Sequence, residues 1–353
     1  TALRLLSDLA RNEGHHRRAL ESCEQALQLV GQEKESLKQR GTILLSRGEV
    51  LRQMGRLKEA VQSYAEALVI YRRLGIKRLQ ALTLNAMGLA ARSVGEYEDA
   101  VGLLRRSLKL DQQINDRFRV GQKLCNLGLT YAEAGDLERA MGHLRRSAEV
   151  NQRLGDRRGL EETLIALAEV LLAAGAKAEA ATTIEQARKL AAGNESRDSA
   201  VRTCLLKADL ALDAGEAADA ASSAREAVEL AAASCMVTGE IQGQARIALA
   251  EARLGNTGPA RVALERAEEL LAQAGQVEKA DAGYLLFAQA WEAIGDAEEA
   301  ARSYSRARTE VESRRGRMKS ASLRDKYDAL PRVGAIEQGS QKSADPSRQA
   351  SQG

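Results

Sequence analysis

Three arginines recur at nearly equal spacing in the first third of the sequence. Arg11, Arg52 and Arg92 are separated by 41 and 40 residues. A planar guanidinium group can donate paired hydrogen bonds to carboxylate or carbonyl oxygens, so a row of arginines is suited to holding an extended partner. The first two follow an acidic residue three positions earlier, and such pairs can simply neutralise each other on a helix surface. At Arg92 the corresponding residue is Leu89. The row is therefore a candidate ligand clamp, with helix-surface ion pairs as the alternative.

Residue types that perform catalysis are sparse. The three histidines are His15, His16 and His143, and all three are expected on the solvated surface. The sequence contains no HExxH segment, no glycine-rich phosphate loop and no Ser/His/Asp or Cys/His set at corresponding positions. Paired glutamates are common on exposed helix faces. We expect no enzyme activity and no cofactor.

The four cysteines are Cys23, Cys125, Cys204 and Cys235, at separations of 102, 79 and 31 residues. These separations do not match the spacing of metal ligands, so no metal site is expected. Cys23 and Cys204 are expected as small core residues, whereas Cys125 could face an inner groove. Since no disulfide framework is implied, a reducing cytoplasmic compartment is expected.

The elements that must position these residues are repeated along almost the whole chain. Eight glycines recur at one interval of 41 residues and then at intervals of 40, and each is followed five residues later by an alanine. The glycines are Gly14, Gly55, Gly95, Gly135, Gly175, Gly215, Gly255 and Gly295. A small residue also occurs seven positions before each glycine, where two helix backbones could approach closely. Self-similarity at a fixed period of this length is the signature of a repeat stack.

Each copy has an apolar helical pattern before the glycine and another after it. In the third copy, Leu84, Met87 and Ala91 fall on one helical face before the turn, and Leu104 and Leu108 line the helix after it. Helix ends between copies are expected at residues that tolerate a left-handed conformation, namely Gly75, Asn115, Gly155 and Gly275. In the seventh copy Gln244 and Glu251 replace apolar residues, so a rotated or looser helix is expected there. The pattern predicts an all-α solenoid of eight tandem helix-turn-helix repeats over residues 1–314.

The repeat resembles the tetratricopeptide repeat (TPR) family. Its pattern is matched closely by Leu124, the pair Leu127-Gly128, Tyr131, Gly135 and Ala140. Asn126 falls on a position where the family often has asparagine, and Tyr64 and Tyr304 fall on its final aromatic position. The family unit is about 34 residues long, whereas the period here is 40. This longer form is similar to the repeats of kinesin light chains, of Pins-type polarity adaptors and of bacterial regulators and kinases.

The resemblance implies a right-handed superhelix whose first helices line a concave groove, with ligand contacts at set positions before each turn glycine. Carried onto this chain, these positions give a candidate ligand groove made of Arg11, Glu49, Arg52, Asn85, Leu89, Arg92, Leu129, Ile165, Glu169, Leu172, Asp209 and Leu212. If the apolar members are open, they should take an amphipathic helix or an extended peptide. The alternative is that they are buried between neighbouring repeats. The clamp for chaperone tails is disfavoured, because Leu45 and Glu49 stand at two of its positions.

The sequence changes character after the eighth copy. Residues 302–332 carry ten Lys or Arg against four Asp or Glu, and Leu323, Tyr327 and Leu330 could lay an apolar edge on the last repeat. A solenoid end needs such a cover, so a basic capping helix is expected over 315–336, with Pro331 ending it. Residues 337–353 are polar and are expected to form a disordered tail.

Charge and composition favour a protein or peptide partner over nucleic acid or membrane. The formal net charge is +3 with 29% charged residues, which gives little attraction to polyanions. A basic cluster on the second helices (Arg105, Arg106, Lys109, Arg145 and Arg146) has no interleaved aromatic residues that could stack on bases. No apolar run approaches the roughly 20 residues that span a bilayer. The sequence makes no prediction of oligomeric state.

Two interpretations of function follow. In the first, the chain is an adaptor whose groove binds a peptide or helical segment of a partner protein. In the second, it is the sensor or regulatory region of a longer bacterial signalling protein, such as a kinase, an ATPase or a transcription regulator. The sequence begins at Thr1 rather than at methionine, so we expect a fragment, which favours the second interpretation slightly.

Overall fold

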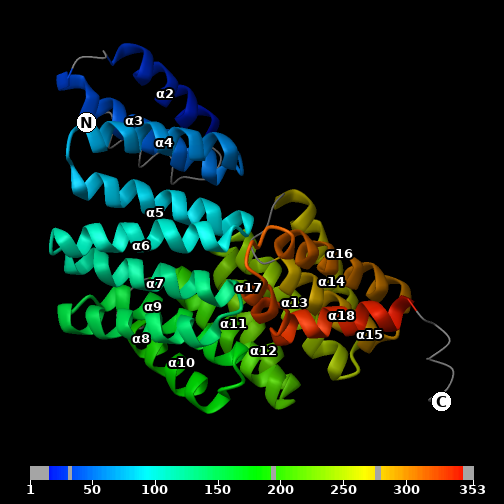
Figure 1. The fold of residues 1–353 in the computed structure, drawn as a ribbon. Helices are drawn as coiled ribbons and strands as arrows, with labels where there is room; N and C mark the ends of the chain where they lie inside the picture. The colour runs from blue at the N-terminus through cyan, green and yellow to red at the C-terminus, as the bar shows by residue number, and fades with distance from the viewer. Residues whose placement is uncertain (1–15, 31–33, 192–195, 275–279, 345–353) are drawn as a thin grey trace. The chain divides into compact units, whose positions relative to one another are not determined.

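The structure is a computed structural model that describes residues 16–30, 34–191, 196–274 and 280–344. These ranges contain only helices and no strand (Figure 1). In chain order the helices are α2 (His16–Leu29), α3 (Lys34–Gln53), α4 (Leu57–Arg73), α5 (Lys77–Val94), α6 (Tyr97–Gln113), α7 (Arg117–Glu133), α8 (Leu137–Leu154), α9 (Arg157–Ala173), α10 (Lys177–Ala191), α11 (Arg197–Ala214), α12 (Ala217–Ala232), α13 (Val237–Arg253), α14 (Thr257–Ala274), α15 (Ala280–Ile294), α16 (Ala297–Arg315), α17 (Ala321–Asp328) and α18 (Pro331–Ala344). The predicted all-α architecture of consecutive helical hairpins is confirmed.

The repeated glycines terminate the first helix of each hairpin. All seven that lie in the described ranges, from Gly55 to Gly295, have positive φ between 73° and 88°. At Gly95 the next amide, that of Glu96, donates to the Ala91 carbonyl at 2.9 Å, which satisfies a carbonyl that the helix end would leave unpaired. Glycine adopts this left-handed conformation without the steric cost that a Cβ would add. The glycine period therefore sets the positions of the turns.

The junctions between hairpins use the same backbone conformation. Gly75, Asn115 and Gly155 have φ of 68°, 55° and 67°, as the sequence predicts. Cys235 occupies the equivalent position with φ of 54°, and nothing in its residue type indicates this. Gly275, the fourth predicted helix end, lies outside the described residues.

Small residues bring the two helices of a hairpin together. The alanines five residues after the turn glycines are all buried, from Ala19 to Ala300. A side chain at Gly88 would meet the Leu104 side chain, and one at Gly48 would meet the Tyr64 ring. Interiors this closely packed leave no room for an added methyl group.

The chain divides into two compact units, which are described separately. Unit 1 comprises residues 1–130 and unit 2 comprises residues 131–353. In unit 1 the largest buried side chains include Tyr64, Tyr71 and Tyr97. In unit 2 the largest apolar cluster joins α11 to α16 and contains Phe287 and Trp291.

The seventh repeat keeps the register of its neighbours. Ile241 and Ala248 on α13 are buried at positions that are buried in the other described repeats. Glu251 is buried as well, and its carboxylate accepts hydrogen bonds from Arg225 of α12 and from Asn256, the latter at 2.7 Å. Because the buried charge is paired, the helix does not need to rotate. The expectation of a rotated or looser helix is wrong.

The segment after the last repeat forms two helices instead of one. Pro331 begins α18 and does not end the cap, since a proline at the first helical position lacks only an N–H that would have no partner within the helix. The helix continues through 337–344, so the predicted start of a disordered tail at 337 is wrong; residues 345–353 lie outside the described part. Val333 and Ile336 are buried. The cap is therefore held by an apolar face that extends beyond the predicted boundary.

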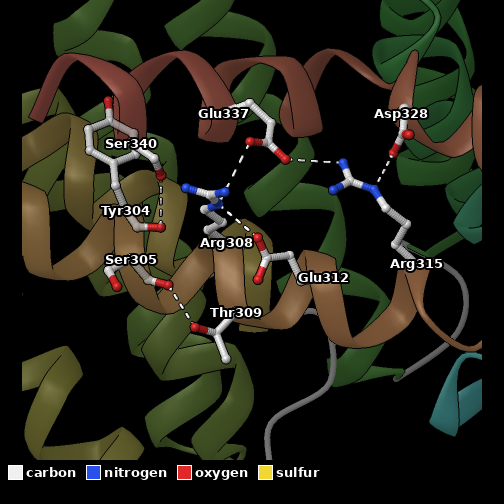
Figure 2. A network of polar contacts seen from close by, with 9 residues as sticks. All are labelled: Tyr304, Ser305, Arg308, Thr309, Glu312, Arg315, Asp328, Glu337 and Ser340. Carbon is white, nitrogen blue, oxygen red and sulfur yellow. Dashed lines mark hydrogen bonds and ion pairs between the residues drawn. The ribbon is translucent and has the colours of Figure 1, made fainter. Parts of the chain in front are cut away.

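Polar contacts join α18 to α16 along the length of the cap, as Figure 2 shows. Glu337 of α18 accepts a hydrogen bond from Arg315 of α16 at 3.1 Å, and its other carboxylate oxygen lies 3.9 Å from Arg308. Arg315 also binds Asp328, the last residue of α17, at 2.8 Å. Close approach is needed at Gly339, where a side chain would collide with the Tyr304 ring. The middle of α18 is thus attached to the last repeat.

Candidate functional site

The predicted groove residues lie on the first helices of the repeats, and the structure separates them between the two units. Arg11 lies outside the described residues. Helices α3, α5 and α7 carry Glu49, Arg52, Asn85, Leu89, Arg92 and Leu129 in unit 1; α9 and α11 carry Ile165, Glu169, Leu172, Asp209 and Leu212 in unit 2. We call the first set, together with Asn126, the unit 1 face.

At one end of the unit 1 face, an acid, an arginine and a tyrosine form one network. Arg52 donates to both carboxylate oxygens of Glu49, at 2.6 and 3.1 Å. The Tyr64 hydroxyl donates to Glu49 Oε2 at 3.0 Å. Burial of Tyr64, with Glu49 beside it, raises the pKa of its hydroxyl far above the usual range, so the hydroxyl keeps the proton that it donates to Glu49. The i, i+3 alternative therefore applies to Arg52, whose guanidinium is already bound to a carboxylate.

The middle of the unit 1 face contains two amides from successive repeats. Asn126 Nδ2 of α7 donates to Asn85 Oδ1 of α5 at 2.9 Å, across 41 residues of sequence. Leu89, Arg92 and Leu129 are each half-buried. Amide donors and acceptors beside half-exposed leucines are the groups that can hold both the backbone and the apolar side chains of an extended peptide.

The corresponding apolar residues of unit 2 are more deeply buried. Ile165 is 0% exposed and belongs to the core cluster between α9, α10 and α11. Leu212 is buried in the large cluster of α11 to α16, whereas Leu172 is half-buried at the edge of its cluster. In unit 2 the structure thus favours the second sequence-based alternative, burial between neighbouring repeats.

The carboxylates of unit 2 are bound by arginines from the next repeat. Arg202 of α11 donates to Glu169 of α9 at 2.7 Å. Arg246 of α13 binds both oxygens of Asp209 at 2.7 Å. A bidentate pair of this kind fixes geometry as well as charge. These acids link adjacent first helices, which leaves little of their hydrogen-bonding capacity for a ligand.

The sequence belongs to a known family of such repeats. The family profile described as "MalT-like TPR region" matches residues 1–315. The chain is a member of the MalT-like TPR region family. No curated protein matches the sequence.

Several solved structures share the fold of this MalT-like TPR chain. A Rap protein complexed with competence and sporulation factor has a TM-score of 0.67, with 14% identity over 85% of this chain and 81% of that one. NprR in complex with its cognate peptide NprX has a TM-score of 0.57, with 13% identity over 98% of each chain. Aspartyl phosphate phosphatase F from Bacillus subtilis has a TM-score of 0.55, with 13% identity over 98% of this chain and 94% of that one. At these identities the likeness shows the fold alone.

Several contacts of this MalT-like TPR chain are not evident from the sequence. The sequence does not indicate that Arg202 and Arg246 are the partners of Glu169 and Asp209. The Asn85–Asn126 contact had a signal, since Asn126 matches the family's frequent asparagine. The bond from Tyr64 to Glu49 had none, because its aromatic position predicts only packing.

The structure shows the surroundings of the histidine and cysteine side chains in the described residues. Within the searched part of the chain, no group of three or more His, Cys, Asp or Glu could hold a metal ion. His143 is half-buried and stacks on the Tyr131 ring at 5.4 Å, rather than being fully solvated. Burial raises the pKa of the Cys23 and Cys204 thiols to about 11, so both are protonated core residues at neutral pH. No described helix is long and apolar enough to cross a membrane.

Proposed function

We propose that this chain is a protein-interaction scaffold that holds an extended peptide or a helical segment of a partner protein on the unit 1 face. One observation carries the proposal. The inward positions of α5 and α7 keep half-buried leucines beside the paired amides of Asn85 and Asn126. The predicted groove residues of unit 2 are buried or bound by arginines, except Leu172, which is half-buried at the edge of its cluster. A partly open surface with apolar anchors and convergent polar groups is what peptide recognition needs.

The arrangement suggests a role for each group. Asn126 is half-buried and gives one Nδ2 hydrogen to Asn85, which is 8% exposed. The remaining groups of the Asn126 amide would bind the backbone of the partner. Leu89 and Leu129 would contact its apolar side chains, and Arg92 would attract a carboxylate. The network of Glu49, Arg52 and Tyr64 holds the end of the face rigid.

A second, compatible role is favoured by the fold. Among proteins of this fold, NprR is in complex with its cognate peptide and a Rap protein with competence and sporulation factor. The chain would then be the sensor or regulatory region of a larger bacterial signalling protein that acts in the cytoplasm. The repeats would bind a peptide signal and would perform no catalysis themselves.

The test is capture of a partner from extract of the native cell, followed by peptide mapping of what is retained and titration of the mapped peptide. The variant Arg92→Glu should weaken binding of that peptide at least tenfold, which is about 1.4 kcal/mol, while the helical circular dichroism remains unchanged. The matched control is Arg72→Glu on α4, an exposed arginine of a second helix in the same unit.

A variant that removes one amide and no charge separates the contribution of the amides from that of Arg92. Asn126→Ala should weaken binding of the peptide without changing the preference of the site for peptides of a given net charge. Undiminished binding by both variants would remove the unit 1 face from the function.

A further inference from the structure

The helix α17 does not continue the repeat stack of unit 2. It lies between the last repeat and the turn that precedes α8 (Figure 1). Lys326 of α17 and Asp136 of that turn are 190 residues apart in sequence, yet Lys326 Nζ lies 2.6 Å from Asp136 Oδ2. The chain after the eighth repeat therefore reaches back to the fourth.

The turn fits the backbone of α17 closely. A side chain at Gly135 would collide with the carbonyl group of Lys326 and with the amide of Tyr327. The other turn glycines of unit 2 are different: at Gly175, Gly215, Gly255 and Gly295 an added Cβ would meet nothing within 4 Å. Gly135 is thus the one turn glycine among these that needs to be glycine for contact as well as for conformation.

The acid in this contact, Asp136, is buried and has partners in its own helix as well. Asp136 is 2% exposed, although it stands at the first position of a surface turn. It caps α8 by accepting a hydrogen bond from the Arg139 amide at 3.3 Å, and Arg139 Nη1 lies 3.4 Å from its second oxygen. Lys326 completes its set of cationic partners. The contact covers a charged group that would otherwise face water.

The two ends of the C-terminal segment are attached with unequal strength. Helix α18 buries Val333 and Ile336 and is held by Arg308 and Arg315 through Glu337 (Figure 2). By contrast, α17 has only 8 residues, a length that is not stable as a helix by itself, and Tyr327 is its one buried side chain. Its link to Asp136 uses a lysine whose side chain is 41% exposed, and Asp136 would keep its hydrogen bond and ion pair to Arg139 if that link opened. The contact at the turn can therefore open while α18 stays docked.

We propose that α17 is a releasable latch that closes unit 2 on itself by joining the last repeat to the turn of the fourth. With the latch closed, the turn at Gly135 is covered by the chain's own segment. With the latch open, this turn and the carboxylate of Asp136 become available. The proposal concerns unit 2 alone and does not depend on peptide binding at the unit 1 face.

The test compares two alanine substitutions in the full chain by hydrogen exchange and mass spectrometry. Gly135 has φ of +87° and Gly215 has φ of +81°, so Gly135→Ala and Gly215→Ala carry the same kind of backbone strain. Only the first also collides with α17. Gly135→Ala should speed exchange of the 321–328 amides at least tenfold, with exchange in 331–344 unchanged. Gly215→Ala should leave 321–328 as in the wild type.

A surface variant provides a second test that does not depend on correct folding of the glycine variants. Lys326→Glu places a negative charge beside Asp136 and should release 321–328 in the same way, and high salt should speed exchange of this segment in the wild type. Equal exchange of 321–328 in the wild type and in both Lys326→Glu and Gly135→Ala would overturn the latch. Joint release of 321–328 and 331–344 would also overturn it, because the segment would then be one rigid cap.

Discussion

The most unusual pair of residues in unit 1 is a buried lysine and a buried aspartate. Lys123 of α7 and Asp111 of α6 are both 0% exposed, with Nζ and Oδ2 3.9 Å apart. Burial lowers the pKa of Lys123 to about 8 and raises that of Asp111, although each partly offsets the effect on the other. One repeat further on, the same two positions hold Asn151 and Thr163, which make a neutral hydrogen bond of 3.1 Å. At these two positions one repeat has a buried ion pair where the next has a neutral hydrogen bond.

We expect unit 1 to be no more stable with this ion pair than with two apolar residues in its place. We expect the loss of one partner alone to destabilise unit 1. Lys123→Met alone should destabilise unit 1 by on the order of 3 kcal/mol, because Asp111 would be buried without a counter-charge. The double replacement Lys123→Met/Asp111→Leu should be neutral or stabilising, by up to about 4 kcal/mol. Urea unfolding of the four members of this double-mutant cycle measures both effects.

The matched control for this cycle is the exposed i, i+4 pair of Arg158 and Glu162 on α9. Replacing both by Met and Leu should change the stability little, because exposed ion pairs contribute little. If the buried double variant proved as unstable as Lys123→Met alone, the pair would be a net stabilising contact and the desolvation argument would be wrong.

At the scale of elements, the C-terminal cap is fastened to α15 by one buried acid. Asp281 is 1% exposed, and Arg332 of α18 and Arg314 of α16 lie 3.0 and 3.3 Å from its two oxygens. Burial opposes the ionised form, but the two arginines outweigh it and lower the pKa of Asp281 below its usual value. The ionised acid therefore joins three helices.

This site predicts how docking of α18 depends on pH. Because the folded pKa of Asp281 is lowered, its contribution is fully present above the unfolded value of about 3.9 and is lost as the pH falls through the folded value. Hydrogen exchange of 331–344 should therefore accelerate relative to that of α11 as the pH falls below about 4, after correction for the intrinsic rate.

The variant Asp281→Asn tests the assignment of this pH dependence. It should release α18 already at neutral pH and should show no further acid-induced change. An acid response of α18 that persists in this variant would contradict the assignment to Asp281.

At the scale of the whole molecule, contacts in a repeat stack join neighbouring repeats, so that stability accumulates locally and cooperativity can fail over a long array. We expect calorimetric unfolding to show two transitions, one for each compact unit. Lys123→Met should lower the midpoint of one transition, and Asp281→Asn should lower that of the other. A single transition shifted by either variant would show that the two units unfold together.

The sequence is sufficient to predict the repeat architecture because one rule is copied. Each turn glycine from Gly55 to Gly295 has the left-handed conformation that its position predicts, and the alanines five residues later are buried. Side-chain contacts are different, because they depend on residues brought together from separate repeats. The sequence predicts a ligand contact at Glu169, whereas in the structure Glu169 accepts a hydrogen bond from Arg202.

The C-terminal segment shows the limit of such reasoning most clearly. Its apolar edge of Tyr327 and Leu330 is buried as expected. Neither composition nor spacing indicates that Lys326 would reach Asp136, because the repeat period does not extend past the eighth copy. For the same reason the sequence predicts that Pro331 ends the cap, whereas in the structure Pro331 begins α18.

The distance along the chain between Asp136 and Lys326 bears on how the protein emerges from the ribosome. Hairpins built from local contacts can form while synthesis is still in progress, whereas this one contact must wait for 190 further residues. At about 5–20 residues per second the wait is on the order of 10–40 seconds. During that time the turn at Gly135 is open to any chaperone or partner already present on the nascent chain.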